Sequence, residues 1–264
     1  MRCSSINDFK LSKQHLFGLC CFLLILLLSA IDLVAADAGL PLPASLKLEN
    51  QHRDARVYDW DHRHQAILER NQNVKPDVVF IGDSITHFWG GEPADFRGRG
   101  EDSWKMMVGS HVASNLGFGF DYIDNAYYRI QNGELDGIAP RVIVILLGTN
   151  NLGHRKDSAE ICADNMRAFL DLLRQKSPRS KILLLGILPR GDASLNKVIF
   201  ATNRLYSKMA DGKQIYFDDL SGAFLSAGAA AVSKDLMPDG VHPNAKGYEL
   251  LGNGIKTQFD KIGF

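Results

Sequence analysis

The chain has 264 residues, of which 45% are hydrophobic and 23% are charged, an ordinary composition for a globular protein. Its 30 basic and 30 acidic side chains cancel. No basic stripe or acidic tail stands out, so a nucleic-acid partner has no electrostatic support.

The N-terminus has the order of features that marks a secretory signal peptide. Lys10 and Lys13 precede an uncharged apolar run at 16–31, and small residues follow at 34–36. We therefore expect a signal peptide over 1–36, cleaved after Ala36, and a secreted or extracytoplasmic protein. The alternative is an uncleaved membrane anchor, which we favour less because the run is shorter than the roughly twenty residues that span a bilayer.

The chain that remains after cleavage suits one medium domain, which we place at 57–264 behind an N-terminal extension at 37–56. We expect no membrane span in this part. Cys162 is its single cysteine and cannot form an intramolecular disulfide. Because Cys162 lies on a predicted helix with an apolar face, we expect a buried structural thiol rather than a nucleophile.

Apolar runs alternate with segments of helical periodicity along the domain. Runs that are apolar throughout predict strands buried on both faces, as in a parallel sheet. The predicted strands are 77–82, 111–117, 142–148, 181–188 and 214–219, and the predicted helices include 158–176, 194–211 and 244–260. This alternation indicates an open α/β sheet with helices on both sides.

Polar clusters follow three of the predicted strands. They are Gly82–Ser84, Asn115–Asp121 and Gly148–Asn151. The carboxyl ends of parallel strands share one edge of an open α/β sheet, where ligands bind. Asp239 and His242, on the loop before the last predicted helix, complete the set, and we expect all four segments to meet there.

Three of these residues suit nucleophilic catalysis. Ser84, on a strand-to-helix turn, would attack; His242 would take and return its proton, and Asp239 would orient the imidazole ring. Each feature alone has a plainer reading, since Asp83 or Ser84 can be a helix N-cap and Asp-x-x-His can be a turn. The coincidence of the clusters favours the catalytic reading.

Asn150 is the candidate for stabilising a developing oxyanion. It ends a strongly aliphatic strand, where an unpaired amide would cost about 1–3 kcal/mol, and its NH₂ group could donate to an oxyanion. Asn151 is expected to serve as a turn or cap residue.

The four clusters resemble the four blocks of the SGNH (GDSL-type) hydrolases. The matching stretches are "IGDSIT", "NLGFGFD", "GTNN" and "DGVHP". Further stretches, "YRIQNGELDGIAPRVIVILLGTNN" and "ILLLGILPRG", are similar to the branch that contains the platelet-activating-factor acetylhydrolase Ib catalytic subunits. The resemblance covers residues 60–260.

The resemblance implies a flavodoxin-like three-layer α/β/α sandwich with a mainly parallel five-stranded sheet. It also implies ester hydrolysis without a metal or cofactor. By position, Ser84 is the nucleophile, His242 the base and Asp239 its orienter. The oxyanion donors are then the Ser84 N–H, a backbone N–H of the second block and the Asn150 side chain.

The chain departs from the family at Phe120, which stands where the second block has glycine before its aspartate. We expect an ordinary backbone at Phe120, whose N–H donates and whose ring narrows the acyl pocket. Gly119 is the alternative donor. If glycine's freedom at positive φ is required there, the oxyanion hole is weakened.

Other residues near the clusters have two readings each. Candidates for lining the substrate site, with core packing or a surface ion pair as the alternative, are Asp83, His87, Trp89 and Arg190. His154 is expected to be a solvated loop residue.

These observations favour a serine esterase that removes a short acyl group, expected to be acetyl, from a carbohydrate-like or other small polar ester. The rival within the enzyme class is a phospholipid acetylhydrolase. From another class, a non-catalytic carbohydrate-binding protein of the same fold is favoured only by Phe120. Relatives of this type form dimers, but no feature of the sequence locates an interface for a homodimer.

Overall fold

Five parallel strands form the sheet in the part of the chain that the structure describes. Their order across the sheet is β2-β1-β3-β4-β5. The strands are β1 (Val78–Gly82), β2 (Ala113–Gly117), β3 (Val142–Leu146), β4 (Lys181–Leu185) and β5 (Ile215–Asp218). The predicted parallel α/β sheet is confirmed, although each of the five predicted strands extends too far at one or both ends.

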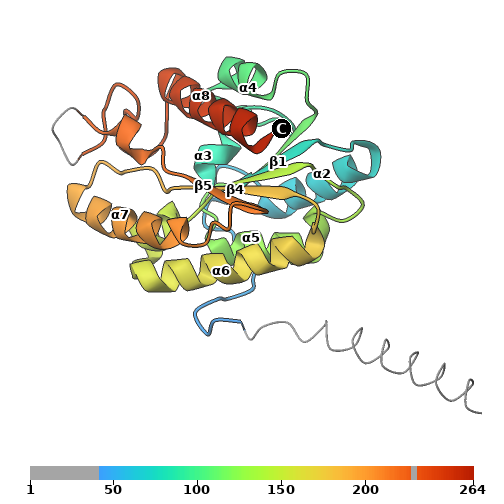
Figure 1. Ribbon diagram of the computed structural model, residues 1–264, viewed down its shortest axis with the longest axis horizontal. Coiled ribbons are helices and arrows are strands. Elements are labelled where there is room, and N and C mark those ends of the chain that lie inside the picture. The colour runs from blue at the N-terminus through green and yellow to red at the C-terminus, as the bar shows by residue number, and fades with distance from the viewer. Residues whose placement is uncertain (1–41, 227–230) are drawn as a thin grey trace, which may run out of the picture. The chain divides into compact units, whose positions relative to one another are not determined.

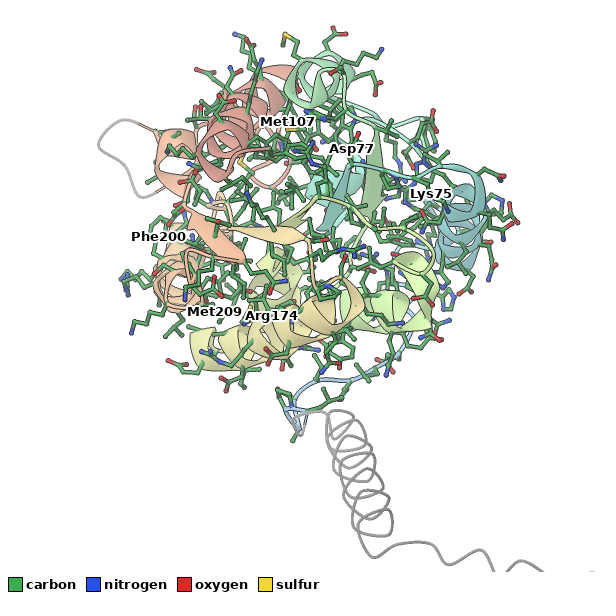
Figure 2. The ribbon with its side chains drawn as sticks, turned by 45° about the vertical axis from the view of Figure 1, so that its right-hand side comes forward. Lys75, Asp77, Met107, Arg174, Phe200 and Met209 are labelled. Carbon is green, nitrogen blue, oxygen red and sulfur yellow. The ribbon has the colours of Figure 1, made fainter. Side chains whose placement is uncertain are left out.

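Both faces of the sheet are buried, which explains why the strands are apolar throughout. Successive side chains of a strand point to opposite faces, so Val79 and Ile81 of β1 join one core while Val78 and Phe80 join the other. Met107 and Met209 belong to these two cores and lie on opposite sides of the sheet (Figure 2).

Helices cover each face (Figure 1). The first core takes side chains from α2 (Trp60–Asn73), α5 (Ile123–Arg129), α6 (Ala159–Lys176) and α7 (Ala193–Ser207). The second takes them from α3 (Ser84–His87), α4 (Glu101–Val108) and α8 (Ala245–Ile262). Shorter helical turns occupy Ile130–Glu134, Asn151–Arg155 and Ser221–Phe224.

The computed structural model describes residues 42–226 and 231–264. The predicted signal peptide lies outside these residues. Pro43–Phe264 form one compact unit, which includes residues 43–56. Among the described residues, no helix has both the length and the apolar character needed to cross a membrane.

Candidate active site

Ser84 is the first residue of α3, directly after β1 ends at Gly82. Asp83 is the N-cap of this helix, because its carboxylate accepts a hydrogen bond from the Ile85 N–H at 2.9 Å. Asp83 is buried, and burial raises the pKa of its carboxyl group to about 7. The plainer N-cap reading therefore holds for Asp83, which serves the turn that presents Ser84 and does not line the pocket.

Two consecutive hydrogen bonds connect Ser84 to His242 and His242 to Asp239. The His242 Nε2 atom lies 2.9 Å from Ser84 Oγ, and His242 Nδ1 lies 2.8 Å from Asp239 Oδ2. The other carboxylate oxygen of Asp239 accepts from the backbone N–H groups of Val241 and His242. The residues that the sequence placed at one sheet edge thus meet in the geometry of a nucleophile, base and orienting acid.

The electrostatics of this pair favour a neutral imidazole beside a charged carboxylate. Burial lowers the pKa of His242, and the contact with Asp239 opposes this effect without cancelling it. Burial would raise the pKa of Asp239, but the hydrogen bonds from His242 and Val241 outweigh it and lower the value to about 2. Because the Nδ1–H group of His242 donates its hydrogen bond to the Asp239 carboxylate, Nε2 carries no proton and can accept the Ser84 proton.

A close backbone contact fixes the loop that carries the pair. The Gly191 N–H donates to the Gly240 carbonyl at 2.8 Å. Gly240 has φ +75, and a Cβ there would lie 3.2 Å from the Gly191 Cα. Only glycine permits this conformation and this approach without strain, so the loop after β4 braces the loop that carries Asp239 and His242.

Three N–H groups beside Ser84 are available as oxyanion donors. The N–H groups of Ser84 and Phe120 have no hydrogen-bond partner among the described residues. Asn150 Nδ2 donates to the Asp121 carbonyl at 3.2 Å, which leaves its second N–H free. Gly119 is not an alternative donor, because its N–H is engaged by His87 Nδ1 at 3.1 Å.

The expectation of an ordinary backbone at Phe120 is wrong. Phe120 has φ +61, in the left-handed region that favours glycine. The chain has replaced the side chain at this position but kept the backbone conformation that a glycine would adopt. Its ring lines the pocket and meets the His154 ring edge to face, with centroids 5.6 Å apart.

A pocket of about 240 Å³ opens beside Ser84. Its lining combines the nucleophile and the base with two apolar and four further residues: Ser84, Phe120, Asn150, Gly153, His154, Arg190, Val241 and His242. This volume is below the ~300–1,000 Å³ of pockets for drug-sized ligands. The pocket is therefore suited to a short, partly polar group.

Arg190 and His154 give the pocket its polar wall. Arg190 donates to the Thr149 hydroxyl at 3.0 Å, and burial lowers the pKa of its guanidinium group. His154 is exposed, as predicted, but it is held by the Tyr122 hydroxyl at 2.8 Å and lines the pocket. Its description as a solvated loop residue therefore missed its place at the site, because no spacing in the sequence links residue 154 to Ser84.

Two predicted lining residues belong to the protein interior instead. Trp89 is a core residue whose indole N–H donates to the Ser103 hydroxyl at 2.9 Å. His87 is buried under the second cluster, where its Nε2 atom lies 3.0 Å from a carboxylate oxygen of Asp95. Burial lowers the pKa of His87 to about 4, so His87 is neutral at physiological pH.

A buried ionic network supports the second cluster, and the sequence analysis missed it. Arg129 has a fully buried side chain that donates to Asp121 at 2.8 Å and to Glu134 at 2.5 Å. Asp121 also accepts from the Trp60 indole at 2.9 Å. These residues are spread over 75 positions of chain, from Trp60 to Glu134, and no motif relates them.

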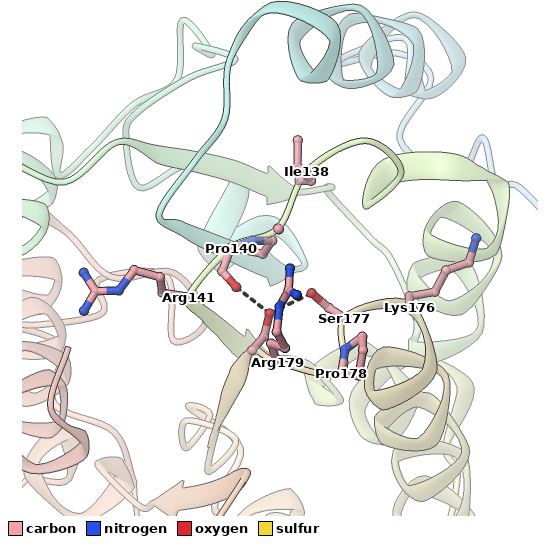
Figure 3. A pocket seen from close by; sticks show the side chains of 9 residues that line it. Ile138, Pro140, Arg141, Lys176, Ser177, Pro178 and Arg179 are labelled. Carbon is pink, nitrogen blue, oxygen red and sulfur yellow. Dashed lines mark hydrogen bonds between the residues drawn. The ribbon is translucent and has the colours of Figure 1, made fainter.

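A second cavity lies at the opposite edge of the sheet (Figure 3). It has a volume of about 410 Å³ and is lined by 138–141 and 176–180. These segments precede β3 and β4, so the cavity is at the amino ends of the strands, away from Ser84. Size alone would select the wrong cavity for the chemistry. Within 42–226 and 231–264, no three His, Cys, Asp or Glu side chains are grouped to hold a metal ion.

An open parallel sheet with a serine, a histidine and an aspartate in line at its carboxyl edge is an architecture of α/β ester hydrolases. Residues 80–250 match the GDSL-like Lipase/Acylhydrolase family, and the chain belongs to this family. It is therefore a carboxylic ester hydrolase.

Relatives agree with this assignment. Platelet-activating factor acetylhydrolase IB subunit alpha2 of Homo sapiens is 29% identical over 198 residues, which cover 73% of this chain and 80% of the relative. The predicted similarity to this branch is confirmed.

Solved structures share the fold. An acetylxylan esterase from Geobacillus stearothermophilus, solved as a catalytic mutant, has a TM-score of 0.58 and 17% identity, covering 72% of this chain and 94% of its own. A carbohydrate esterase family 3 protein from Talaromyces cellulolyticus has a TM-score of 0.52 and 21% identity, covering 70% and 96%. At these identities the likeness shows the fold alone.

Proposed function

We propose that the protein is a serine esterase that removes short acyl groups, above all acetyl, from small polar esters. The observation that carries this proposal is the hydrogen-bonded line from Asp239 through His242 to Ser84, which ends at a small pocket. A descendant that only binds carbohydrate would be expected to have lost or displaced one of these three residues. Here all three are present and hydrogen-bonded to one another.

In the first half of the reaction, Ser84 Oγ attacks the ester carbonyl carbon while His242 Nε2 takes the hydroxyl proton. The carbonyl oxygen becomes an oxyanion and accepts hydrogen bonds from the N–H groups of Ser84 and Phe120 and from Asn150 Nδ2. The tetrahedral intermediate then collapses. The alcohol leaves with the proton from His242, and the acyl group stays on Ser84.

In the second half, water replaces the alcohol. His242 takes a proton from the water, whose oxygen attacks the acyl carbon of the Ser84 ester. The second tetrahedral intermediate uses the same oxyanion donors. Its collapse returns the proton to Ser84 Oγ and releases the carboxylic acid. Throughout, the Asp239 carboxylate stabilises the imidazolium form of His242 and keeps the ring oriented.

The pocket supports the choice of a short acyl group. Phe120 and Val241 supply apolar surface for a methyl or ethyl group. Arg190 and His154 line the same small pocket with polar atoms. A long aliphatic chain would have to bury carbon against these polar groups, which is unfavourable. Acetylated carbohydrate is the favoured substrate class, and acetylxylan esterases of the same fold are the precedent.

The second candidate is an acetylated phospholipid. The observation that favours it is the sequence similarity to subunits named platelet-activating factor acetylhydrolase. Both substrates present an acetyl ester to Ser84 and differ only in the alcohol, so the pocket beside Ser84 does not discriminate between them.

Hydrolysis of p-nitrophenyl acetate, butyrate and octanoate tests the proposal, with Ser84→Ala as the control. The expected result is a rate that falls with chain length and disappears in the Ser84→Ala variant. Acetylated xylooligosaccharides and a 2-acetyl ether phospholipid are then compared by acetate release. A folded protein without Ser84-dependent cleavage of any of these esters would overturn the proposal in favour of a binding protein.

We also propose that the protein is exported from the cytoplasm. The N-terminal order of Lys10 and Lys13, an apolar run and small residues supports a signal peptide. N-terminal sequencing of the mature protein is expected to begin at Asp37, and a mature protein that retains Met1 would contradict cleavage.

A further inference from the structure

The segment Gln51–Tyr58, which precedes α2, touches the backbone next to the oxyanion donors. We call this segment the strap. The Gly119 carbonyl oxygen accepts two hydrogen bonds from it, one from Gln51 Nε2 at 2.8 Å and one from the Tyr58 hydroxyl at 2.8 Å. The strap also packs closely against Gly119, since a Cβ added to this residue would lie only 3.1 Å from the Tyr58 ring.

The neighbouring backbone groups are also engaged. The Gly119 N–H donates to His87 Nδ1 at 3.1 Å, and the Phe120 carbonyl accepts from Arg53 Nη2, on the strap, at 3.2 Å. The Phe120 N–H is the exception, because among the described residues it has no hydrogen-bond partner. Three of the four polar backbone groups of Gly119 and Phe120 are thus held, and the fourth faces no protein acceptor.

The orientation of one peptide unit links these contacts. In a trans peptide the C=O and the N–H point in opposite directions. Holding the Gly119 carbonyl against Gln51 and Tyr58 therefore turns the Phe120 N–H away from the strap. Rotating the unit would leave the Tyr58 hydroxyl without its acceptor and would take one acceptor from Gln51 Nε2, which keeps its bond to Asp121 Oδ1 at 3.1 Å. A buried donor left unpaired costs about 1–3 kcal/mol.

The backbone strain at Phe120 favours rotation of the Gly119–Phe120 peptide. The Phe120 φ of +61 is unfavourable for a residue with a side chain, by about 1–2 kcal/mol. Rotation of the Gly119–Phe120 peptide changes the φ of Phe120 and would return it to the negative range. The strap contacts oppose this relaxation, whereas a glycine at position 120 would need no such restraint.

We infer that the strap is a positioning element of the oxyanion hole, in which Tyr58 and Gln51 hold the Gly119–Phe120 peptide so that the Phe120 N–H stays available to the oxyanion. Neither residue touches the reacting atoms. The inference deepens the proposed esterase function and rests on it for its kinetic consequences. It also assigns a role to part of the chain that lacks any recognisable motif.

The kinetic test removes one hydroxyl group. Tyr58→Phe is expected to lower kcat for p-nitrophenyl acetate about tenfold, with KM and the melting temperature nearly unchanged. The matched control is Tyr216→Phe, which removes a hydroxyl that donates to the Lys213 carbonyl at 3.0 Å on the remote β5. An unchanged kcat in Tyr58→Phe, or an equal loss in Tyr216→Phe, would overturn the inference.

A double-mutant cycle separates positioning from general support. In a Phe120→Gly background, the left-handed conformation is no longer unfavourable, so adding Tyr58→Phe is expected to lower kcat by less than about threefold. The same tenfold loss in both backgrounds would show that Tyr58 acts by another route.

A spectroscopic readout keeps the inference independent of turnover. In protein labelled with ¹⁵N-phenylalanine, Tyr58→Phe is expected to give the Phe120 amide a second or shifted resonance, while Tyr216→Phe leaves it unchanged. This result supports the strap even if no ester is cleaved, in which case only the proposed function fails. A single unshifted Phe120 resonance in Tyr58→Phe would contradict the inference whatever the activity.

Discussion

Asp239 and His242 share a hydrogen bond of 2.8 Å, yet 48% of the Asp239 side chain remains exposed to solvent. In a buried triad the carboxylate is the sole acceptor for the imidazole. Here water can approach the same position, and the other carboxylate oxygen is occupied by the backbone N–H groups of Val241 and His242, which shape the loop. The carboxylate is therefore expected to matter less than the base that it orients.

Replacement of these two residues should have unequal effects. His242→Ala removes the proton acceptor and is expected to lower kcat/KM by more than about 10⁴-fold. Asp239→Asn keeps the shape of the side chain and is expected to lower it by less than the about 10⁴-fold found for a buried triad carboxylate, since water can partly replace the exposed carboxylate. Steady-state kinetics on p-nitrophenyl acetate measures both, and equal losses would show that the exposure of Asp239 is irrelevant.

The pH dependence of hydrolysis should follow His242. Only the neutral imidazole can accept the Ser84 proton, and burial lowers the pKa of His242. Activity is therefore lost as the pH falls through that lowered pKa, so the acidic limb of kcat/KM should lie below the ordinary histidine value of about 6.5. Asp239→Asn removes the charge that raises this pKa, so its acidic limb should move lower still. A limb above 6.5 in the wild type would contradict the geometry.

Asn150 should act on the transition state rather than on substrate binding. Asn150→Ala removes one oxyanion donor, and kcat is expected to fall by about 10²–10³-fold with little change in KM. The matched control is Asn132→Ala, because exposed Asn132 also donates its amide to a backbone carbonyl but lies outside the pocket lining. A rise in KM with unchanged kcat in Asn150→Ala would place Asn150 in ground-state binding.

The buried network should dominate stability. Arg129→Met leaves Asp121 and Glu134 without their shared cation in the interior and is expected to lower the free energy of unfolding by about 3–5 kcal/mol. Arg174→Met removes an exposed pair with Asp211, 3.6 Å apart, and should cost under about 1 kcal/mol. Urea unfolding measures both, and a small loss in Arg129→Met would mean that the network relaxes without its arginine.

Cys162 should be inert in the folded protein. The thiol is buried 3.3 Å from the Tyr206 hydroxyl, and burial raises its pKa to about 12. We expect iodoacetamide to leave the peptide that contains Cys162 unmodified in the native protein and to modify it in urea, as read by mass spectrometry. Cys162→Ala should keep full esterase activity. Rapid labelling of the native protein would show that Cys162 is accessible.

The sheet could be predicted because the apolar sequence of most strands identifies them without reference to their neighbours. Strands such as "VIVIL" of β3 are buried on both faces, so their apolar character is continuous and readable without neighbours. The short helices α4 and α5 escaped prediction because their residues are mixed in character and tertiary packing decides their conformation. The C-terminal end of β4 was misjudged because Gly186–Leu188 remain buried after the strand ends at Leu185.

The site could be predicted only where chemistry and motif coincide. Ser84, Asp239, His242 and Asn150 lie in short blocks whose residue types suit one reaction, and the structure brings all four together. His87 and Trp89 lie three and five residues after the nucleophile, yet both side chains are buried in the interior, which spacing alone does not reveal. The strap was invisible because Gln51 and Tyr58 act through a backbone carbonyl that lies more than sixty residues away in sequence.

The strand order has a consequence for how this protein could change its substrate. The chain leaves β1 toward β2 on one side, and β3 lies on the other side of β1, so the loops after β1 and β3 diverge and open a crevice between them. Ser84 follows β1 and Asn150 follows β3, so the connectivity of the sheet sets the position of the nucleophile and its amide donor. Arg190 and His154, which line the same pocket, lie on the loop after β4 and on the short helical turn after β3. Exchange of those loops with those of a relative should therefore transfer preference for the ester while the reacting centre stays in place.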